Sequence, residues 1–296
     1  MDWYVYSILA ALFFTGMTLC VKKLTTDLKF SSEKILFFLL LFLFIGFLSI
    51  SFQSLPLVFA SDNFLFLLLL TSVGGLFSAI GNWTDFEGIK RAPNAGYAVA
   101  IRNFSFVLTI FISTLLFGSE IKFFKLFGAI LITAGIIFLI VDKKQTANEK
   151  NSILPWYVFS FSACLAVAIV ILITKKATLL STDFSIQSIN LFIVGFCLLF
   201  LSFFNLKKLR GYFTEKENLK VFFLFTASAT VFSFLGNIVK IIGLDLAPNP
   251  GYSEAIVKTD LLFITILSAK LFSAKLNKYK LLGIFVILIG LIILAF

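Results

Sequence analysis

Two stretches of the chain decide its architecture: GNWTDFEGIKRAPNAGYAVAI at residues 81–101 and GNIVKIIGLDLAPNPGYSEAI at residues 236–256. The match between them continues without a gap to Val141 and Phe296. A shared excess of Leu, Ile and Phe does not explain it, because many matched residues are Gly, Pro, Asn or Tyr. The front ends also correspond, since DWYVYS at Asp2 matches PWYVFS at Pro155. The chain is therefore expected to hold two copies of one structural unit.

The composition indicates that the chain lies in a lipid bilayer. Hydrophobic residues make up 60% of the 296 residues and charged residues only 14%, and the mean hydropathy is +1.05. Soluble domains are about half apolar and about a quarter charged. The net charge of +10 does not indicate a nucleic-acid partner. The basic residues lie between apolar runs, where the positive-inside rule explains them.

Ten apolar stretches approach the roughly 20 residues that a membrane-spanning helix needs. None alternates as barrel strands do. The expected helices are Trp3–Val21, Lys34–Ser51, Asn63–Ile89, Ala95–Phe117, Lys122–Val141, Pro155–Thr174, Ser185–Phe204, Leu219–Asp245, Pro250–Phe272 and Tyr279–Phe296.

Each copy of the repeat contains five of these helices, and an odd number of crossings inserts the second copy upside down. We therefore predict an all-α integral membrane protein with ten transmembrane helices in two inverted five-helix repeats. The repeats would span residues 1–145 and 153–296, on either side of the polar linker at 142–152. Inverted repeats are typical of secondary transporters, which bind their solute near the midplane between the repeats.

The sequence resembles the EamA-type members of the drug/metabolite transporter superfamily. The resemblance lies in the five-plus-five repeat, the APN-x-GY segments and a Gly-rich fifth helix after Gly118-Ser119-Glu120. The second copy has Ser273-Ala274-Lys275 at that turn and departs from the pattern. The resemblance implies a carrier for small metabolites, amino acids, drugs or nucleotide-sugars, often an exporter, and it identifies no substrate-binding residue.

The third and eighth expected helices carry matching polar faces. In the first copy, Ser78, Asn82 and Asp85 have the spacing of one helix face. The second copy has the matching residues Ser233, Asn237 and Lys240, and Thr230 extends its stripe. Polar groups within a bilayer usually face the protein interior or a water-filled cavity. We expect these residues to line a substrate cavity; hydrogen bonds between helices are the alternative.

Further ionisable residues follow in the fourth and ninth helices: Arg102, Glu254 and Lys258. They complete the expected cavity, with a role in binding or proton coupling. Across the short turns after the third and eighth helices, we expect two ion pairs, Asp85–Arg102 and Lys240–Glu254, one near each membrane face. Glu254 and Lys258 are also four residues apart and can pair within one helix.

These features predict a secondary transporter in the cell membrane. It would move a small metabolite, amino acid or drug-like solute by alternating access, as an exporter or exchanger. A flippase or carrier for a lipid-linked or nucleotide-linked sugar is one alternative, and a membrane-embedded transferase is another. The chain has no His, and Cys20, Cys164 and Cys197 show no metal-binding spacing, so we expect no catalytic residue, metal or cofactor.

Two further questions stay open in the sequence. Gly128, Gly135, Gly283 and Gly290 permit close helix packing, either within one subunit or in a homodimer. Lys and Arg gather in the connections after the odd-numbered helices, which by the positive-inside rule puts both termini outside the cytoplasm. The family resemblance implies the opposite orientation.

Overall fold

The structure is a computed structural model. It describes residues 2–28, 32–54, 62–91, 101–140, 155–180, 219–271 and 278–295, together with positions 30, 56, 59, 60 and 98. The expected helix at 185–204 and the linker at 142–152 lie outside these residues, as do Pro93, Asn94, Gly96 and Tyr97.

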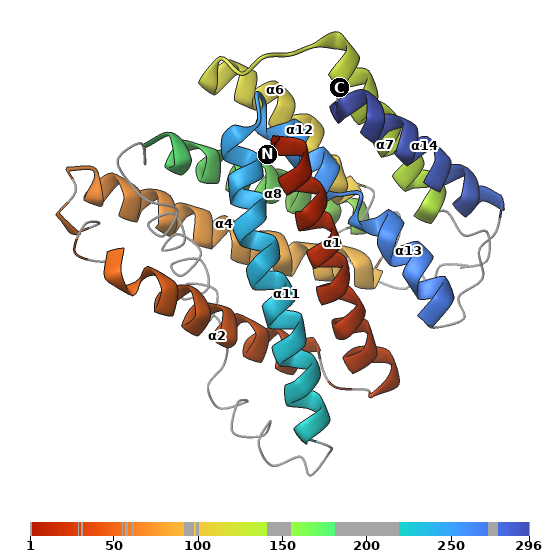
Figure 1. Cartoon of the computed structure of the whole chain (residues 1–296), viewed down its shortest axis with the longest axis horizontal. Helices are drawn as coiled ribbons and strands as arrows, with labels where there is room; N and C mark the ends of the chain where they lie inside the picture. The colour runs from red at the N-terminus through yellow and green to blue at the C-terminus, as the bar shows by residue number, and fades with distance from the viewer. Residues whose placement is uncertain are drawn as a thin grey trace.

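The described residues form helices and no strands, which confirms the all-α class (Figure 1). Six helices are long and apolar enough to cross a membrane, and shorter apolar helices accompany them. The elements are α1 (Trp3–Lys22), η1 (Lys23–Asp27), α2 (Ser32–Ser51), η2 (Phe52–Ser54), α4 (Phe64–Arg91), α6 (Ser105–Phe117), α7 (Phe123–Ile140), α8 (Trp156–Leu180), α11 (Leu219–Leu246), α12 (Pro250–Val257), α13 (Asp260–Leu271) and α14 (Lys278–Ala295).

The expectation that residues 95–117 and 250–272 form unbroken helices is wrong. In the first copy the chain turns at Phe104 before α6, and in the second it turns at Lys258 and Thr259 between α12 and α13. The two interruptions occupy matching positions of the repeat. Both following helices begin with a short polar residue, Ser105 or Asp260. Such residues compete for backbone hydrogen bonds and favour helix starts over helix interiors.

The two turns also share one hydrogen-bond pattern. The Phe104 N–H donates to the Ile101 carbonyl at 3.1 Å, and the Thr259 N–H donates to the Ile256 carbonyl at 3.0 Å. Both bonds reach back three residues, so each helix tightens into a 3₁₀-type turn. Such a turn within a helix often marks a hinge.

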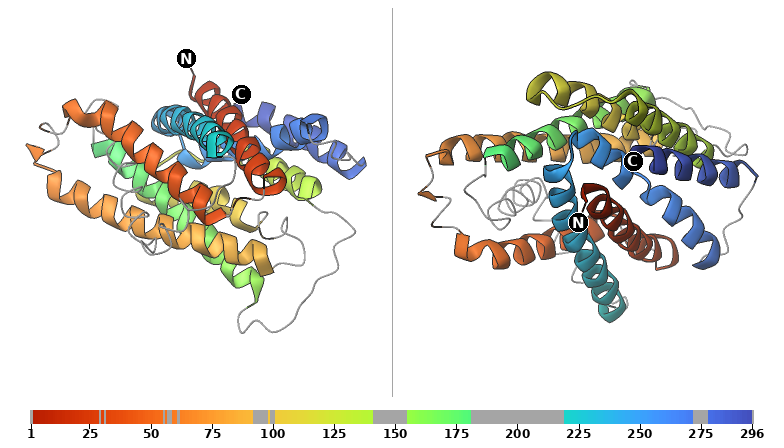
Figure 2. Two further views of the ribbon diagram at one scale, coloured as in Figure 1. Left: turned by 90° about the horizontal axis from the view of Figure 1, so that it is seen from below. Right: turned by 45° about the horizontal axis from the view of Figure 1, so that its top comes forward.

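The helices pack in pairs that exchange partners between the two halves (Figures 1 and 2). α1 of the first half packs along α11 of the second, and α8 of the second half packs along α4 of the first. The glycines show the correspondence in detail. A Cβ on Gly243 would lie 2.9 Å from the Ser7 hydroxyl, and one on Gly88 would lie 2.7 Å from the Ser160 hydroxyl. These are matching residues of the two halves.

α7 and α14 lie side by side along a seam of glycines (Figure 1). A Cβ on Gly128 would lie 2.9 Å from the Gly290 carbonyl oxygen, and one on Gly135 would lie 2.8 Å from the Gly283 carbonyl oxygen. The two helices are therefore antiparallel, although their sequences are copies of each other. This is packing within one subunit, the first of the two roles expected for these glycines.

The start of α1 and the end of α14 lie close together. The Lys125 ammonium donates to the Leu294 carbonyl at 3.0 Å and lies 5.4 Å from the centre of the Trp3 ring. One side chain of α7 thus contacts both terminal helices.

Candidate functional site

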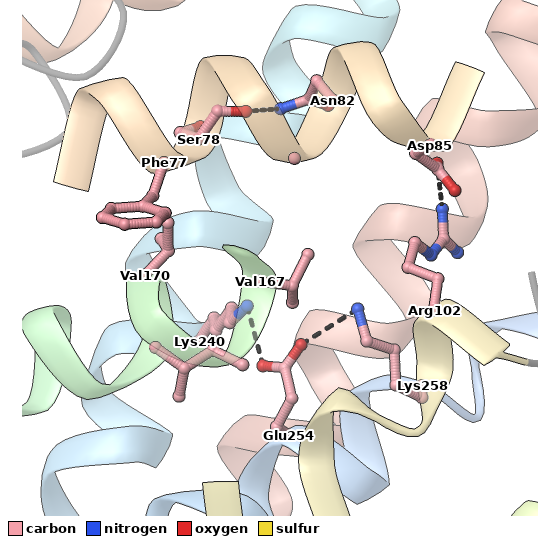
Figure 3. Close-up of a pocket in the computed structure, with 12 residues that line it drawn as sticks. Phe77, Ser78, Asn82, Asp85, Arg102, Val167, Val170, Lys240, Glu254 and Lys258 are labelled. Atoms are coloured by element: carbon pink, nitrogen blue, oxygen red, sulfur yellow. Dashed lines mark hydrogen bonds and ion pairs between the residues drawn. The ribbon is translucent and has the colours of Figure 1, made fainter. Parts of the chain in front are cut away.

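A cavity of about 270 Å³ lies between the two halves of the molecule (Figure 3). α4 contributes lining residues from the first half of the chain. α8, α11 and α12 contribute lining residues from the second half. The lining residues are Phe77, Ser78, Gly81, Asn82, Asp85, Arg102, Val167, Val170, Ile171, Lys240, Glu254 and Lys258.

Both expected ion pairs are present in this cavity (Figure 3). The Arg102 guanidinium donates from Nη1 to Asp85 Oδ2 at 2.6 Å. Lys240 Nζ lies 2.8 Å from Glu254 Oε2. The two predicted ion pairs are therefore confirmed.

Lys258 makes the second pair a three-membered group. Its Nζ lies 3.0 Å from Glu254 Oε1, so each carboxylate oxygen of Glu254 faces one lysine. Glu254 is fully buried, whereas 15% of the Asp85 side chain is exposed. A buried carboxylate needs such partners, because a bare charge at this depth is strongly unfavourable.

The two pairs, which the sequence analysis places near opposite membrane faces, line one cavity. Asp85 and Lys240 line the same cavity. α4 and α11 are each 28 residues long, or about 42 Å at 1.5 Å per residue. That exceeds the roughly 30 Å of a bilayer core. A residue near the end of either helix can therefore still lie deep in the bundle.

α12 places Glu254 at the centre of the molecule, and all eight residues of this helix are buried. The Asn249 side chain caps the helix, because its Oδ1 accepts from the Gly251 N–H at 2.9 Å. Its Nδ2 donates to the Ile110 carbonyl of α6 at 3.2 Å. A Cβ on Gly251 would lie 2.6 Å from the Ile110 backbone nitrogen. The Asn and Gly of the second APN-x-GY segment thus fix α12 against the first half.

The two polar stripes differ in their relation to this cavity. Ser78 and Asn82 line the cavity, but Thr230, Ser233 and Asn237 are absent from its lining. This stretch of α11 packs against α1 and α2 instead. Thr230 donates its hydroxyl to the Thr226 carbonyl at 2.8 Å, and Asn237 donates to the Ser233 carbonyl at 2.8 Å. For these three residues, local hydrogen bonding within the helix is the observed role.

The apolar wall of the cavity had no signal in the sequence. Val167, Val170 and Ile171 of α8 face the charged groups. They sit within a helix that is apolar almost throughout, so no polar residue marks the face that meets the cavity. Only the packing of α8 along α4 identifies it.

Several polar atoms around the cavity have no hydrogen-bond partner among the described residues. They are Asp85 Oδ1, both oxygens of Glu254, and Asn103 Nδ2 next to the site. The Nζ atoms of Lys240 and Lys258 nevertheless lie 2.8 and 3.0 Å from the two Glu254 oxygens and neutralise the carboxylate. In the part of the chain that the structure describes, no three His, Cys, Asp or Glu residues lie close enough to bind a metal.

Comparison with known proteins finds a family match over part of the chain and a similar fold. The EamA-like transporter family matches residues 1–141, as the sequence resemblance predicted. No curated protein matches. Among solved structures, 29 chains match. In one crystal structure the TM-score is 0.72 at 14% identity, over 98% of this chain and 95% of the other. At that identity the likeness shows the fold alone.

Proposed function

We propose that this chain, an EamA-like membrane transporter of small solutes by its match over residues 1–141, works as a secondary transporter by alternating access. Its cargo is a small metabolite, amino acid or drug-like solute, which it exports or exchanges. The observation that carries this proposal is the cavity between the halves, where five charged side chains meet. Charged groups buried in a membrane protein typically mark a solute or ion pathway.

The pairing of the helices supports two inverted five-helix repeats as the transport machinery. α1 of the first half packs along α11 of the second, and α8 of the second half packs along α4 of the first. The matching helices α7 and α14 run antiparallel. Lys125 holds the ends of α1 and α14 near each other, as an even number of crossings requires. If a two-fold axis in the membrane plane relates the repeats, each half can adopt the conformation of the other. The cavity then opens to the opposite side of the membrane.

The matching turns at Phe104 and Thr259 support hinges within this machinery. They lie two residues after Arg102 and one residue after Lys258, beside the charged groups of the cavity. A small rotation at either turn changes the distances within the ion pairs. The pairs can thus open and close as the two halves rock.

The size of the cavity favours a small solute. Pockets for drug-sized ligands span about 300–1,000 Å³, and this cavity measures about 270 Å³. A nucleotide-linked or lipid-linked sugar is larger than a typical drug. The cavity therefore favours a metabolite or amino acid over the sugar-carrier alternative.

Counterflow in liposomes tests the proposal. Purified protein is reconstituted with an internal panel of unlabelled amino acids, organic acids and amines, and uptake of each labelled solute is followed. We expect saturable exchange for at least one solute, and its loss in Arg102→Ala. The control is Lys122→Ala, in an exposed turn with 62% of the side chain accessible. Flux that does not saturate and follows voltage would show a channel instead.

A further inference from the structure

Among the described residues that line the cavity, positive charges outnumber negative ones. Arg102, Lys240 and Lys258 contribute three positive charges, while Asp85 and Glu254 contribute two negative charges. Asp260 begins α13 behind the cavity, within electrostatic range of Lys258 and Arg102, but it does not line the space. Among the described residues that line the cavity, a solute thus meets three positive and two negative charges, with the carboxylate of Asp260 outside the lining.

The extra charge belongs to the second half alone. Lys258 matches Asn103 in the first half, where Arg102 makes the single pair with Asp85. In the second half, two lysines approach one carboxylate from two sides (Figure 3). This arrangement is a site for a carboxylate, with one cation for each oxygen.

Glu254 is the carboxylate in that site. Its two oxygens lie 2.8 and 3.0 Å from the Nζ atoms of Lys240 and Lys258. Lys240 and Lys258 remain 22% and 18% exposed, whereas Glu254 is fully buried, so both cations can still be reached by a solute.

We propose that the cavity binds small organic anions, and that the carboxylate of the solute binds Lys258 and Lys240 from their exposed side, next to the buried Glu254. Glu254 then acts as a built-in counter-ion that neutralises the lysines when the cavity is empty. The inference rests on the proposed transport function and narrows its substrate class. A solute that carries only positive charge has no place here, because it would add to the three cations.

Binding to the purified chain in lipid nanodiscs tests the proposal with three probes of one shape: benzoate, benzamide and benzylammonium. Calorimetry and thermal unfolding measure each probe at matched ionic strength. We expect benzoate to bind and to raise the unfolding temperature, and the other two to do neither. Equal binding of benzamide or benzylammonium would overturn the proposal.

The variant Glu254→Gln removes the resident carboxylate and leaves both lysines. We expect benzoate to bind about tenfold more tightly than to the wild type, since it no longer competes for the lysines. Unchanged or weaker binding would contradict the role of Glu254. Lys258→Met keeps the Lys240–Glu254 pair, and we expect it to lose the response to benzoate; an undiminished response would overturn the proposal even if Glu254→Gln fails to fold.

Glu120→Gln is the matched control, because it removes a carboxylate from a Lys pair in an exposed turn. It should bind benzoate as the wild type does. The outcomes for binding and for transport are separable. Benzoate binding without counterflow of any solute would support the anion site and contradict the transport function. Counterflow of amines without benzoate binding would support the transport function and contradict the anion site.

Discussion

The two halves of the molecule share a backbone design but differ in charge. Both interrupt a helix at the matching positions Phe104 and Thr259, with the same hydrogen bonds. The first half places one carboxylate against one guanidinium, while the second surrounds Glu254 with two lysines. Under the proposed alternating-access function, the common geometry would serve a conformational change that both halves make. The difference in charge would then give the second half the larger share of solute recognition.

The contact between α7 and α14 along the glycine seam is where we expect a substitution to have the largest effect. Gly135→Leu should produce the largest effect, because its side chain would enter the backbone of α14 at Gly283. Overpacking of a close backbone contact costs about 3 kcal/mol or more in the free energy of unfolding. We expect little monodisperse protein by size-exclusion chromatography.

Gly46→Ala is the control for the seam. A Cβ at Gly46 meets only the Phe234 ring, at 3.4 Å, which is ordinary contact distance. This variant should elute as the wild type does. If Gly135→Leu is equally well behaved, the antiparallel seam does not hold the two halves together.

The unequal charges predict unequal losses. Glu254→Gln leaves two lysines without their carboxylate, and breaking a buried ion pair costs about 3–5 kcal/mol. Asp85→Asn leaves one partly exposed guanidinium and removes one charged hydrogen bond, which we expect to cost about 1.5–3 kcal/mol. Thermal unfolding in detergent measures both. Equal losses would show that the two halves hold their charges alike.

Asn82 and Asn237 sharpen the comparison, since they are matching residues and only Asn82 lines the cavity. Asn82→Leu should lower counterflow about tenfold, the effect of one lost hydrogen bond of about 1.4 kcal/mol to the solute or its water. Asn237→Leu should change it much less. If both variants fold normally and lose transport equally, the polar stripe of α11 is also part of the solute path.

We expect the smallest effect on stability from a substitution in the turn at Thr259. The Thr259 hydroxyl donates to the Ile256 carbonyl at 2.7 Å within the turn, and Thr259→Val removes that bond at a cost of about 1 kcal/mol. We expect the counterflow rate to change as well. Thr265→Val is the control, because its hydroxyl makes the equivalent 2.7 Å bond to Leu261 inside α13, away from the turn. A similar effect of both variants on the rate would argue against a hinge.

The sequence by itself determined the membrane class, the repeat and the positions of most helices. These follow from local quantities, namely the length of apolar runs and the spacing of matched residues. It also predicted the Asp85–Arg102 and Lys240–Glu254 pairs, because a short turn fixes which residues of neighbouring helices lie opposite each other.

Only the tertiary structure decided where those pairs lie and what else joins them. Asp85 and Lys240 line one cavity, Lys258 joins Glu254 there, and Thr230, Ser233 and Asn237 are not among its lining residues. Each outcome depends on which helix packs against which face. Apolar helices in a bilayer show no hydrophobic face that would reveal their neighbours, since lipid and protein interior are equally apolar. The interruptions at Phe104 and Thr259 were missed although Ser105 and Asp260 follow them, because a single 3₁₀-type turn barely changes the length of an apolar run.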